Sequence, residues 1–347
     1  MSETMQKDEV SLNVEKVVGD ILTSIDRERE REIIARRYGL YDRKETLEQI
    51  GELLGITRER VRQLEKAVMT KLKAMAAKDL PHIAEAEQVL SNLVKSMGGV
   101  ARVADITDKI VKNANKIDKS RVSFIAQLSP NITHIEENDH FHNTIALKGN
   151  YSEKTLRDNV GNVIDAIKKI DKPVKIEEVA GAMGHPDSAV VAALASASKD
   201  LATLNGRWGL MKWPTVNPKN IRDKIYVILH ENGKQMHFGE IAESIRESDF
   251  KRKDVTTQAI HNELIKDKRF VLVGRGIYAL KEWGFKQGTV ADVISEVLKD
   301  AGEPLHRDEI VKRVLKKRFV KETTILLNLQ GKPQFKRTAK ATYTLAA

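Results

Sequence analysis

Residues 46–73, TLEQIGELLGITRERVRQLEKAVMTKLK, have the pattern of two amphipathic helices joined by a short turn. In each helix, apolar residues recur at the helical period, which predicts one buried face. In the first helix they are Leu47, Ile50, Leu53 and Leu54, and in the second Val61, Leu64, Val68 and Leu72. Gly55 predicts the end of the first helix. Thr57 is a favoured N-cap for the second, because its hydroxyl accepts a hydrogen bond from a free amide of the next turn.

The outward face of the second helix carries side chains that hydrogen-bond base edges and phosphates in a DNA major groove. They are Arg58, Glu59, Arg62, Gln63 and Lys66. Any amphipathic helix has charges on its solvent face, so each residue alone indicates little. Their combination after a glycine-bearing turn predicts a helix-turn-helix that binds double-stranded DNA.

The segment ITRERVRQLEKAVMTKLK, residues 56–73, resembles the recognition segment of the fourth conserved region of housekeeping-type bacterial sigma factors. Upstream, IDRERERE and IIARRYGLYDRKETLEQIGELLG resemble the rest of that region, so the resemblance spans residues 12–76. It implies a helix-turn-helix domain at residues 12–78, preceded by a flexible tail at residues 1–11.

The resemblance also implies roles for individual residues. The positions matching base contacts to the minus thirty-five promoter element are Arg58, Glu59 and Gln63. The positions near phosphates are Thr57, Arg60, Arg62 and Lys66. The chemistry agrees, because arginine pairs bidentately with guanine and glutamate accepts from the cytosine amino group. Basic neighbours add affinity without sequence information. Residues 27–40 would dock on the flap of the beta subunit of core RNA polymerase.

The chain also departs from this family. A complete sigma factor places its promoter-melting helices, which carry exposed aromatics, before this region. Here only residues 1–11 precede the resemblance, and no aromatic residue occurs before Tyr38. We therefore expect that the chain does not melt a promoter on its own.

Composition sets wider limits. A formal net charge of +10 favours an anionic partner, and nucleic acid is favoured over membrane because no long apolar run exists. The length of 347 residues predicts two to four ordinary domains, or more if they are small. The N-terminus lacks a signal-peptide core, and zero cysteines exclude disulfides and thiolate metal sites. We expect a bacterial cytoplasmic, nucleoid-associated protein without cofactor or metal.

Beyond residue 78 the sequence repeats. Residues 221–280 and 290–345 share an order of motifs that predicts three helices and a hairpin, the parts of a winged helix. The shared motifs are a glycine (Gly233 or Gly302), a histidine (His237 or His306), a helix start (Thr256-Thr257 or Thr323-Thr324) and a hairpin tyrosine (Tyr278 or Tyr343). Two fainter copies precede these, one with an Asn205-Gly206 turn signal. The predicted units are residues 86–148, 156–213, 219–283 and 288–347.

The predicted fold class is therefore mainly α: a sigma region 4 helix-turn-helix followed by tandem winged-helix (α+β) units. The last two units resemble the HARE-type helix-turn-helix, a winged-helix family also found in the delta subunit of RNA polymerase. That resemblance lies in Pro304-Leu305-His306, Glu309-Ile310 and Tyr343-Thr344-Leu345. The two inner units resemble winged helices by pattern only. Linkers are expected near residues 77–86, 149–158, 214–219 and 284–288.

Basic residues gather in the last unit, before its third helix and in its wing. As secondary DNA contacts, the candidates are Lys316, Lys317, Arg318, Lys321, Lys336 and Arg337, with Lys312, Arg313 and Lys340 beside them. Two interpretations stay open. The cluster is either a solubilising face or a set of contacts with DNA phosphates.

Several other motifs favour structural roles. For His237 with Glu240, and for His306 with Glu309, capping or packing is favoured over a metal site. The histidines at 134, 140 and 142 are expected on one solvated strand face. The run Gly274-Arg275-Gly276 is expected to be a wing turn. No nucleophile, base and orienting residue form a recognisable motif, so we expect no enzyme activity.

The preferred interpretation is a sequence-specific DNA-binding transcription factor. Two alternatives remain: a nucleoid or DNA-modification accessory protein that binds duplex DNA without polymerase, and an interaction scaffold whose HARE-type units bind protein.

Overall fold

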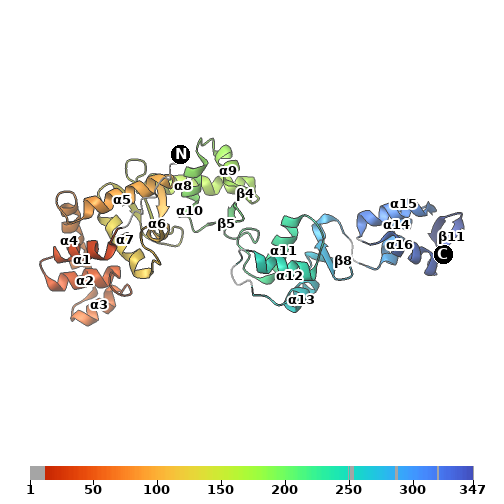
Figure 1. Ribbon diagram of the computed structural model, residues 1–347, viewed down its shortest axis with the longest axis horizontal. Helices are drawn as coiled ribbons and strands as arrows, with labels where there is room; N and C mark the ends of the chain where they lie inside the picture. Colours follow the sequence, from red (N-terminus) through yellow and green to blue (C-terminus); the bar gives the residue numbers. More distant parts are fainter. Residues whose placement is uncertain (1–11, 249, 251–253, 286–287, 319, 347) are drawn as a thin grey trace, which may run out of the picture. The chain divides into compact units, whose positions relative to one another are not determined.

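The computed structural model describes residues 12–248, 250, 254–285, 288–318 and 320–346. It divides into two compact units, residues 1–212 and 213–347, which are described separately (Figure 1). The tail expected at residues 1–11 lies outside the described residues. No helix in the described part of the chain has the length and apolar content needed to cross a membrane.

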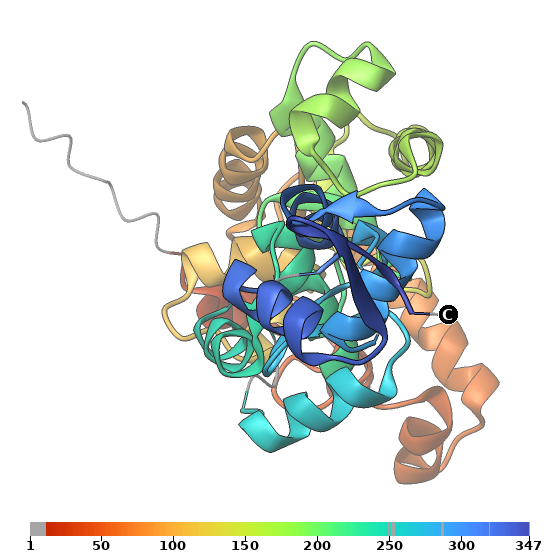
Figure 2. The same ribbon diagram turned by 90° about the vertical axis from the view of Figure 1, so that its right-hand side faces the viewer.

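The first unit begins with four helices. They are α1 (Val14–Thr23), α2 (Glu28–Tyr38), α3 (Leu47–Leu54) and α4 (Arg58–Ala76). Figure 2 shows α3 and α4, in the salmon part of the colour range, at the edge of this unit. A capping box between Thr46 and Gln49 begins α3, and Gly55 ends it with a φ of +61°. The Thr57 hydroxyl accepts from the Arg60 amide at 3.2 Å and begins α4. The predicted turn and both predicted caps are confirmed.

A small apolar core holds α2, α3 and α4 together. It consists of the buried residues Ile33, Ile50 and Val61, with Leu47, Leu54, Ile56 and Leu64 packed around them. The prediction for Leu53 was wrong, since that side chain is 54% exposed. It falls at the edge of the apolar stripe and outside this small core. Gly51 allows the turn to pack closely, because a Cβ there would lie 2.6 Å from the Ile56 carbonyl oxygen.

After α4, one order of elements occurs four times: helix, strand, helix, helix, strand, strand. In the first unit the copies are α5 (Ile83–Ser96), β1 (Val100–Arg102), α6 (Val103–Ile110), α7 (Lys116–Leu128), β2 (Ile132–Ile135) and β3 (Thr144–Leu147), then α8 (Glu153–Ile170), β4 (Val174–Lys175), α9 (Ile176–Met183), α10 (Ser188–Ala197), β5 (Leu201–Leu204) and β6 (Arg207–Leu210).

In the second unit the copies are α11 (Ile221–Asn232), β7 (Met236–His237), α12 (Phe238–Glu247), α13 (Thr257–Lys266), β8 (Phe270–Gly274) and β9 (Ile277–Leu280), then α14 (Val290–Ala301), β10 (Leu305–His306), α15 (Arg307–Lys317), α16 (Glu322–Gly331), β11 (Phe335–Ala339) and β12 (Thr342–Leu345). The short 3-10 helix η1 (Lys281–Trp283) follows β9. Each copy has a three-stranded antiparallel sheet whose last strand lies in the middle. The predicted fold class, mainly helical with small β units, is confirmed.

Two segments expected to be linkers contain helix starts. Helix α5 begins at Ile83, and α8 begins at Glu153 because the Ser152 hydroxyl caps it in a capping box with Thr155. In the last copy α16 begins at Glu322, slightly before the expected Thr323-Thr324 start.

Three of the four N-terminal helices, α1, α2 and α4, share one hydrophobic core with the first copy of the repeated order of elements. The fully buried members of this core include Ile21, Ile34, Leu40, Leu72, Leu90 and Phe124. Arg121, on α7, is 7% exposed and donates to the Leu40 carbonyl at 2.9 Å, while it pairs with Asp118 and Glu15. The ring of Tyr38 lies 5.0 Å from that of Phe124. Helices α1, α2 and α4 are therefore packed against the first copy, while α3 is held by the small core of Ile33, Ile50 and Val61.

The loop between β2 and β3 packs on the next copy. Phe141 forms a bridge with Ser198 and is 8% exposed, and Arg157 lies over its ring. The prediction of one solvated histidine face was wrong. His134 lies in β2, where it hydrogen-bonds Asn143 and where burial lowers its pKa. The histidines at positions 140 and 142 lie in the loop, because the β2–β3 ladder ends at Ile135 and Thr144.

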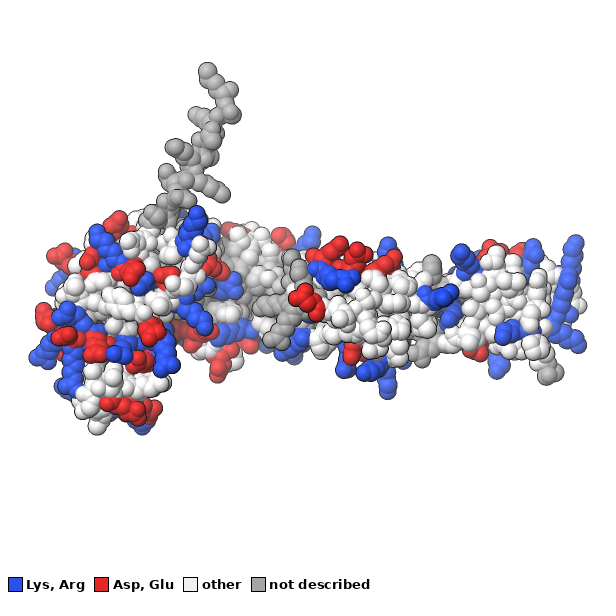
Figure 3. Space-filling model, turned by 60° about the horizontal axis from the view of Figure 1, so that its bottom comes forward, with Lys and Arg blue, Asp and Glu red and all other residues white. Residues whose placement is uncertain are grey.

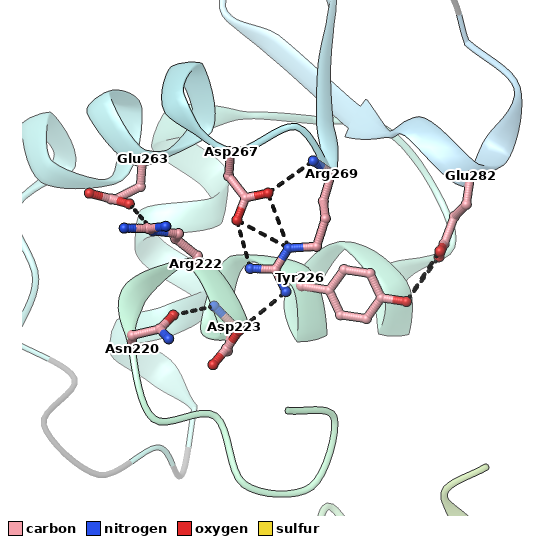
Figure 4. A network of polar contacts seen from close by, with 8 residues as sticks. All are labelled: Asn220, Arg222, Asp223, Tyr226, Glu263, Asp267, Arg269 and Glu282. Carbon is pink, nitrogen blue, oxygen red and sulfur yellow. Dashed lines mark hydrogen bonds and ion pairs between the residues drawn. The ribbon is translucent and has the colours of Figure 1, made fainter. Parts of the chain in front are cut away.

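In the second unit, a polar network ties α11 to the connection between α13 and β8 (Figure 4). Arg269 pairs with Asp267 at 2.7 Å and with Asp223 at 3.2 Å, and its guanidinium lies over the ring of Tyr226. The Arg269 hydrogen bonds lower the pKa of Asp267. The Tyr226 hydroxyl donates to Glu282, so the network also reaches the segment after β9.

The predicted capping roles are mostly confirmed. His237 and Glu240 form a capping box at the start of α12, and His306 accepts from the Asp308 amide at the start of α15. Glu309 instead pairs with Arg313 at 2.7 Å, one turn along the helix. The expected wing turn at Gly274-Arg275-Gly276 joins β8 to β9, and Gly276 has a φ of +69°.

Candidate nucleic-acid interface

The outward face of α4 is exposed over its first three turns. The sequence-predicted residues on it are all exposed: Thr57, Arg58, Glu59, Arg60, Arg62, Gln63 and Lys66. At 1.5 Å per residue, Arg58 and Lys66 lie about 12 Å apart along the axis, close to the width of a major groove. The inward residues Val61, Val68 and Leu72 are buried and fix the rotation of the helix. The structure therefore brings the predicted residues together on one accessible surface.

Five of these side chains, those of Arg58, Glu59, Arg60, Arg62 and Gln63, are paired with one another or with α3. Arg62 makes two hydrogen bonds with Glu59, at 2.9 and 2.7 Å, and Arg60 donates to the Gln63 amide oxygen at 3.3 Å. Arg58 pairs at 2.8 Å with Glu48, which lies on α3. Sequence reasoning missed Glu48, because only the angle between α3 and α4 places it beside Arg58. The donor and acceptor groups engaged in these pairs become available to DNA only when the pairs open or rearrange.

The pairing affects the ionisation of this face. Hydrogen bonds from Arg62 lower the pKa of Glu59 below its usual value and raise the pKa of Arg62. Glu59 is therefore a carboxylate at neutral pH and acts only as a hydrogen-bond acceptor. An acceptor at this position suits the amino group of cytosine.

Comparison with known proteins assigns this part of the chain to a family. Residues 27–74 match the model of the family described as Sigma-70, region 4. These residues are a sigma-70 region 4 domain. The helix-turn-helix of α3 and α4 is thus a DNA-binding segment of the sigma-factor type.

Individual sigma factors are similar over the same stretch. The chain is 43% identical over 68 residues to RNA polymerase sigma factor SigA1 of Synechococcus elongatus. The aligned stretch covers 19% of this chain and 17% of that protein. It is 45% identical over 58 residues to the principal sigma factor HrdD of Streptomyces griseus, covering 16% and 17%. It is 50% identical over 46 residues to sigB of Arabidopsis thaliana, covering 13% and 8%. The chain thus spans less than a fifth of the length of these relatives.

The side of region 4 away from the α4 face is partly covered by the same chain. Within residues 27–40, Ile33, Ile34 and Leu40 are buried, and the last two lie in the core shared with α7. The accessible side chains of α2 are polar, and several are already paired, as Arg37 is with Glu65 at 3.4 Å. The segment expected to dock on the polymerase flap therefore presents charged rather than apolar side chains.

The second set of predicted DNA contacts lies in the second unit. Lys317 pairs with Glu296 at 3.1 Å and with Asp300 at 3.0 Å, and Arg318 donates to the Gly288 carbonyl. These two cations are therefore held within their own unit. The remaining four are exposed: Lys316, Lys321, Lys336 and Arg337.

Proposed function

We propose that this chain is a sequence-specific DNA-binding transcription factor that reads promoter-type duplex DNA, of the minus thirty-five kind, through α4. In this proposal Arg58, Glu59 and Gln63 contact bases. The phosphate contacts are Thr57, Arg60, Arg62 and Lys66. The observation that carries it is an exposed α4 face within a sigma-70 region 4 domain. A bacterial cytoplasm, with the protein on the nucleoid, is the corresponding location.

Binding-site selection from random duplexes tests this proposal, followed by substitutions on the selected site. Arg58→Ala or Gln63→Ala is expected to lower affinity for that site by about 1–3 kcal/mol and to relax the preference at one base pair. Lys66→Ala is expected to weaken binding to all duplexes about equally. Equal losses on selected and random DNA for all three variants contradict base reading by α4.

A second candidate function is duplex binding without RNA polymerase, as in a nucleoid or DNA-modification accessory protein. The observation that favours it is the burial of Ile34 and Leu40 in a core shared with α7. The two functions separate in a pull-down of core RNA polymerase, or of its isolated flap, by the full chain. Capture supports the polymerase-associated function, and its absence with intact DNA binding supports the accessory function.

For the second unit, we infer two HARE-type winged helices. Support comes from the matching histidine-capped helices α12 and α15 and from hairpins that share one register. Relatives of each copy are collected separately, and the two sequence profiles are compared. Dissimilar profiles contradict a common origin of the two copies.

A further inference from the structure

The four winged-helix copies end in hairpins whose outer faces differ. In the first copy, the loop of the hairpin is covered by the next copy through Phe141 and Ser198. In the second, the hairpin strands carry one cation, Arg207. In the third, Val271 and Val273 on the outer face are 1% and 0% exposed. The fourth hairpin is therefore compared most directly with the third, whose length and register it shares.

The third and fourth hairpins align residue by residue. Phe270 pairs with Leu280 as Phe335 pairs with Leu345, and both ladders shift register at the same place. By this alignment Lys336 takes the position of Val271, Thr338 that of Val273, and Lys340 that of Arg275. The turn residues Gly276 and Ala341 both have positive φ, +69° and +57°.

The outer faces of these two aligned hairpins have different neighbours. In the third copy, Trp283 and Phe285 from the segment after β9 pack against Val271 and Val273. In the fourth copy, Lys336 and Thr338 are exposed, and Thr342 and Thr344 are half-buried beside them. An apolar, covered surface has thus been replaced by an accessible one with hydroxyls and the ammonium group of Lys336, which all donate hydrogen bonds, whereas Lys340 keeps the positive charge that Arg275 has in the third copy.

The charge of this surface is not compensated locally. No Asp or Glu follows Glu322, while the chain after it carries Lys332, Lys336, Arg337 and Lys340. Within the described residues, neither Lys336 nor Lys340 has an ion-pair partner, whereas Lys317 of the same copy has two. Figure 3 shows blue side chains in a row at the end of the second unit that carries β11. The face is therefore a strongly positive patch.

The third helix of this copy differs from α4. Helix α16 carries no Lys or Arg, and its most exposed large apolar side chain is Leu327, at 67%. It lacks the arginines that read guanine, so base recognition by this helix is not supported. A row of cations and hydroxyls without a base-reading helix suits the phosphate backbone, which carries no sequence information.

We propose that the outer face of the β11–β12 hairpin, centred on Lys336 and Lys340, binds the phosphate backbone of duplex DNA without reading its sequence. A protein partner is less suited, because specific protein interfaces have an apolar centre and few lysines. The site is separate from α4. With both sites on one chain, binding at one raises the local concentration of DNA at the other.

The test uses the full chain carrying Arg58→Ala, Arg60→Ala, Arg62→Ala, Gln63→Ala and Lys66→Ala, so that α4 loses all the cations proposed to contact DNA. Binding to a random duplex is measured over a range of salt concentrations. Adding Lys336→Ala and Lys340→Ala is expected to reduce the slope of log K against log salt by about 1.8, which is about a 60-fold loss of affinity at 0.1 M salt. Thermal unfolding checks that these exposed substitutions leave the fold intact.

The matched control removes two exposed cations from the third copy that lie outside its hairpin, by Lys266→Ala and Lys268→Ala. It is expected to change the slope by less than half as much. Equal effects of the two pairs, or no effect of the Lys336 and Lys340 pair, overturn the proposal. Polyglutamate and duplex DNA are also compared as competitors at equal charge. If polyglutamate competes as effectively as duplex, the proposal is overturned in favour of an acidic protein partner. Failure of α4 to read sequence appears separately, as unchanged preferred-site binding when only the α4 substitutions are present.

Discussion

The pair between Arg58 and Glu48 limits how readily α4 engages DNA. The Arg58 guanidinium lies 2.8 Å from the Glu48 carboxylate, and the side chains are 72% and 64% exposed. If Arg58 reads a base, this pair opens on binding. We therefore predict that Glu48→Gln raises the affinity for the preferred duplex, although it removes a contact from the free protein.

The size of this effect follows from the exposure of the pair. Two exposed partners at this distance stabilise each other by about 0.2–1 kcal/mol. Opening the pair on DNA binding costs this energy, and Glu48→Gln removes the cost, which raises the affinity for the duplex by about 1.4- to 5-fold. By contrast, Arg58→Ala loses the base contact itself, about 1–3 kcal/mol, or about 5- to 150-fold. The two substitutions thus change affinity in opposite directions although each breaks the same ion pair.

Glu48→Gln also removes a negative charge close to the DNA, and Glu52→Gln controls for this. Glu52 lies on the same helix and beside the same turn, and no ion pair engages it within the described residues. Affinities are measured by fluorescence anisotropy for both variants, alone and with Arg58→Ala. The gain from Glu48→Gln is expected to exceed that from Glu52→Gln, and the excess to vanish when Arg58 is absent. A loss of affinity in Glu48→Gln, or equal gains in both variants, would refute the reasoning.

Three further predictions concern stability. Arg121→Met leaves the Asp118 carboxylate buried without its partner. It is expected to lower the free energy of unfolding, measured by urea titration, by about 3–5 kcal/mol. An unchanged urea midpoint contradicts coupling of α7 to region 4. Thr57→Ala removes the cap accepted from the Arg60 amide and is expected to cost about 1 kcal/mol, whereas Thr57→Ser restores it. Burial lowers the pKa of His134, so the unfolded chain binds more protons and stability falls as pH drops through the ordinary histidine range. In His134→Gln this part of the pH dependence of stability is expected to disappear. An unaltered profile of stability against pH argues against a role of His134 in it.

Features set by local chemistry were predicted from the sequence. Gly55 and Thr57 act within one or two residues of the backbone that they terminate or begin, so their roles could be predicted without the tertiary fold. The histidine caps of α12 and α15 were predicted for the same reason. Whether the exposed α4 residues contact DNA stays a prediction.

Features set by distant contacts were missed. The hydrogen bond from Arg121 to the Leu40 carbonyl joins residues 81 positions apart, and nothing in either local sequence indicates it. Leu53 has the period of a core residue but lies where no helix covers it. Glu48 gains its partner only from the angle between two helices.

The core shared with α7 also restricts how region 4 can meet a polymerase. Ile34, Leu40 and Phe124 are each fully buried, and exposing an apolar side chain of this size costs about 1.5–3 kcal/mol. Separating the three, together with Arg121, therefore costs a large part of the roughly 5–15 kcal/mol that stabilises a domain. A flap contact through the apolar side of α2 has to offset that cost, whereas one through its polar side, residues 27–32, does not. Charge reversal at Glu28, which is exposed, thus distinguishes the two routes: it abolishes polymerase capture through the polar side and leaves capture through the apolar side unchanged.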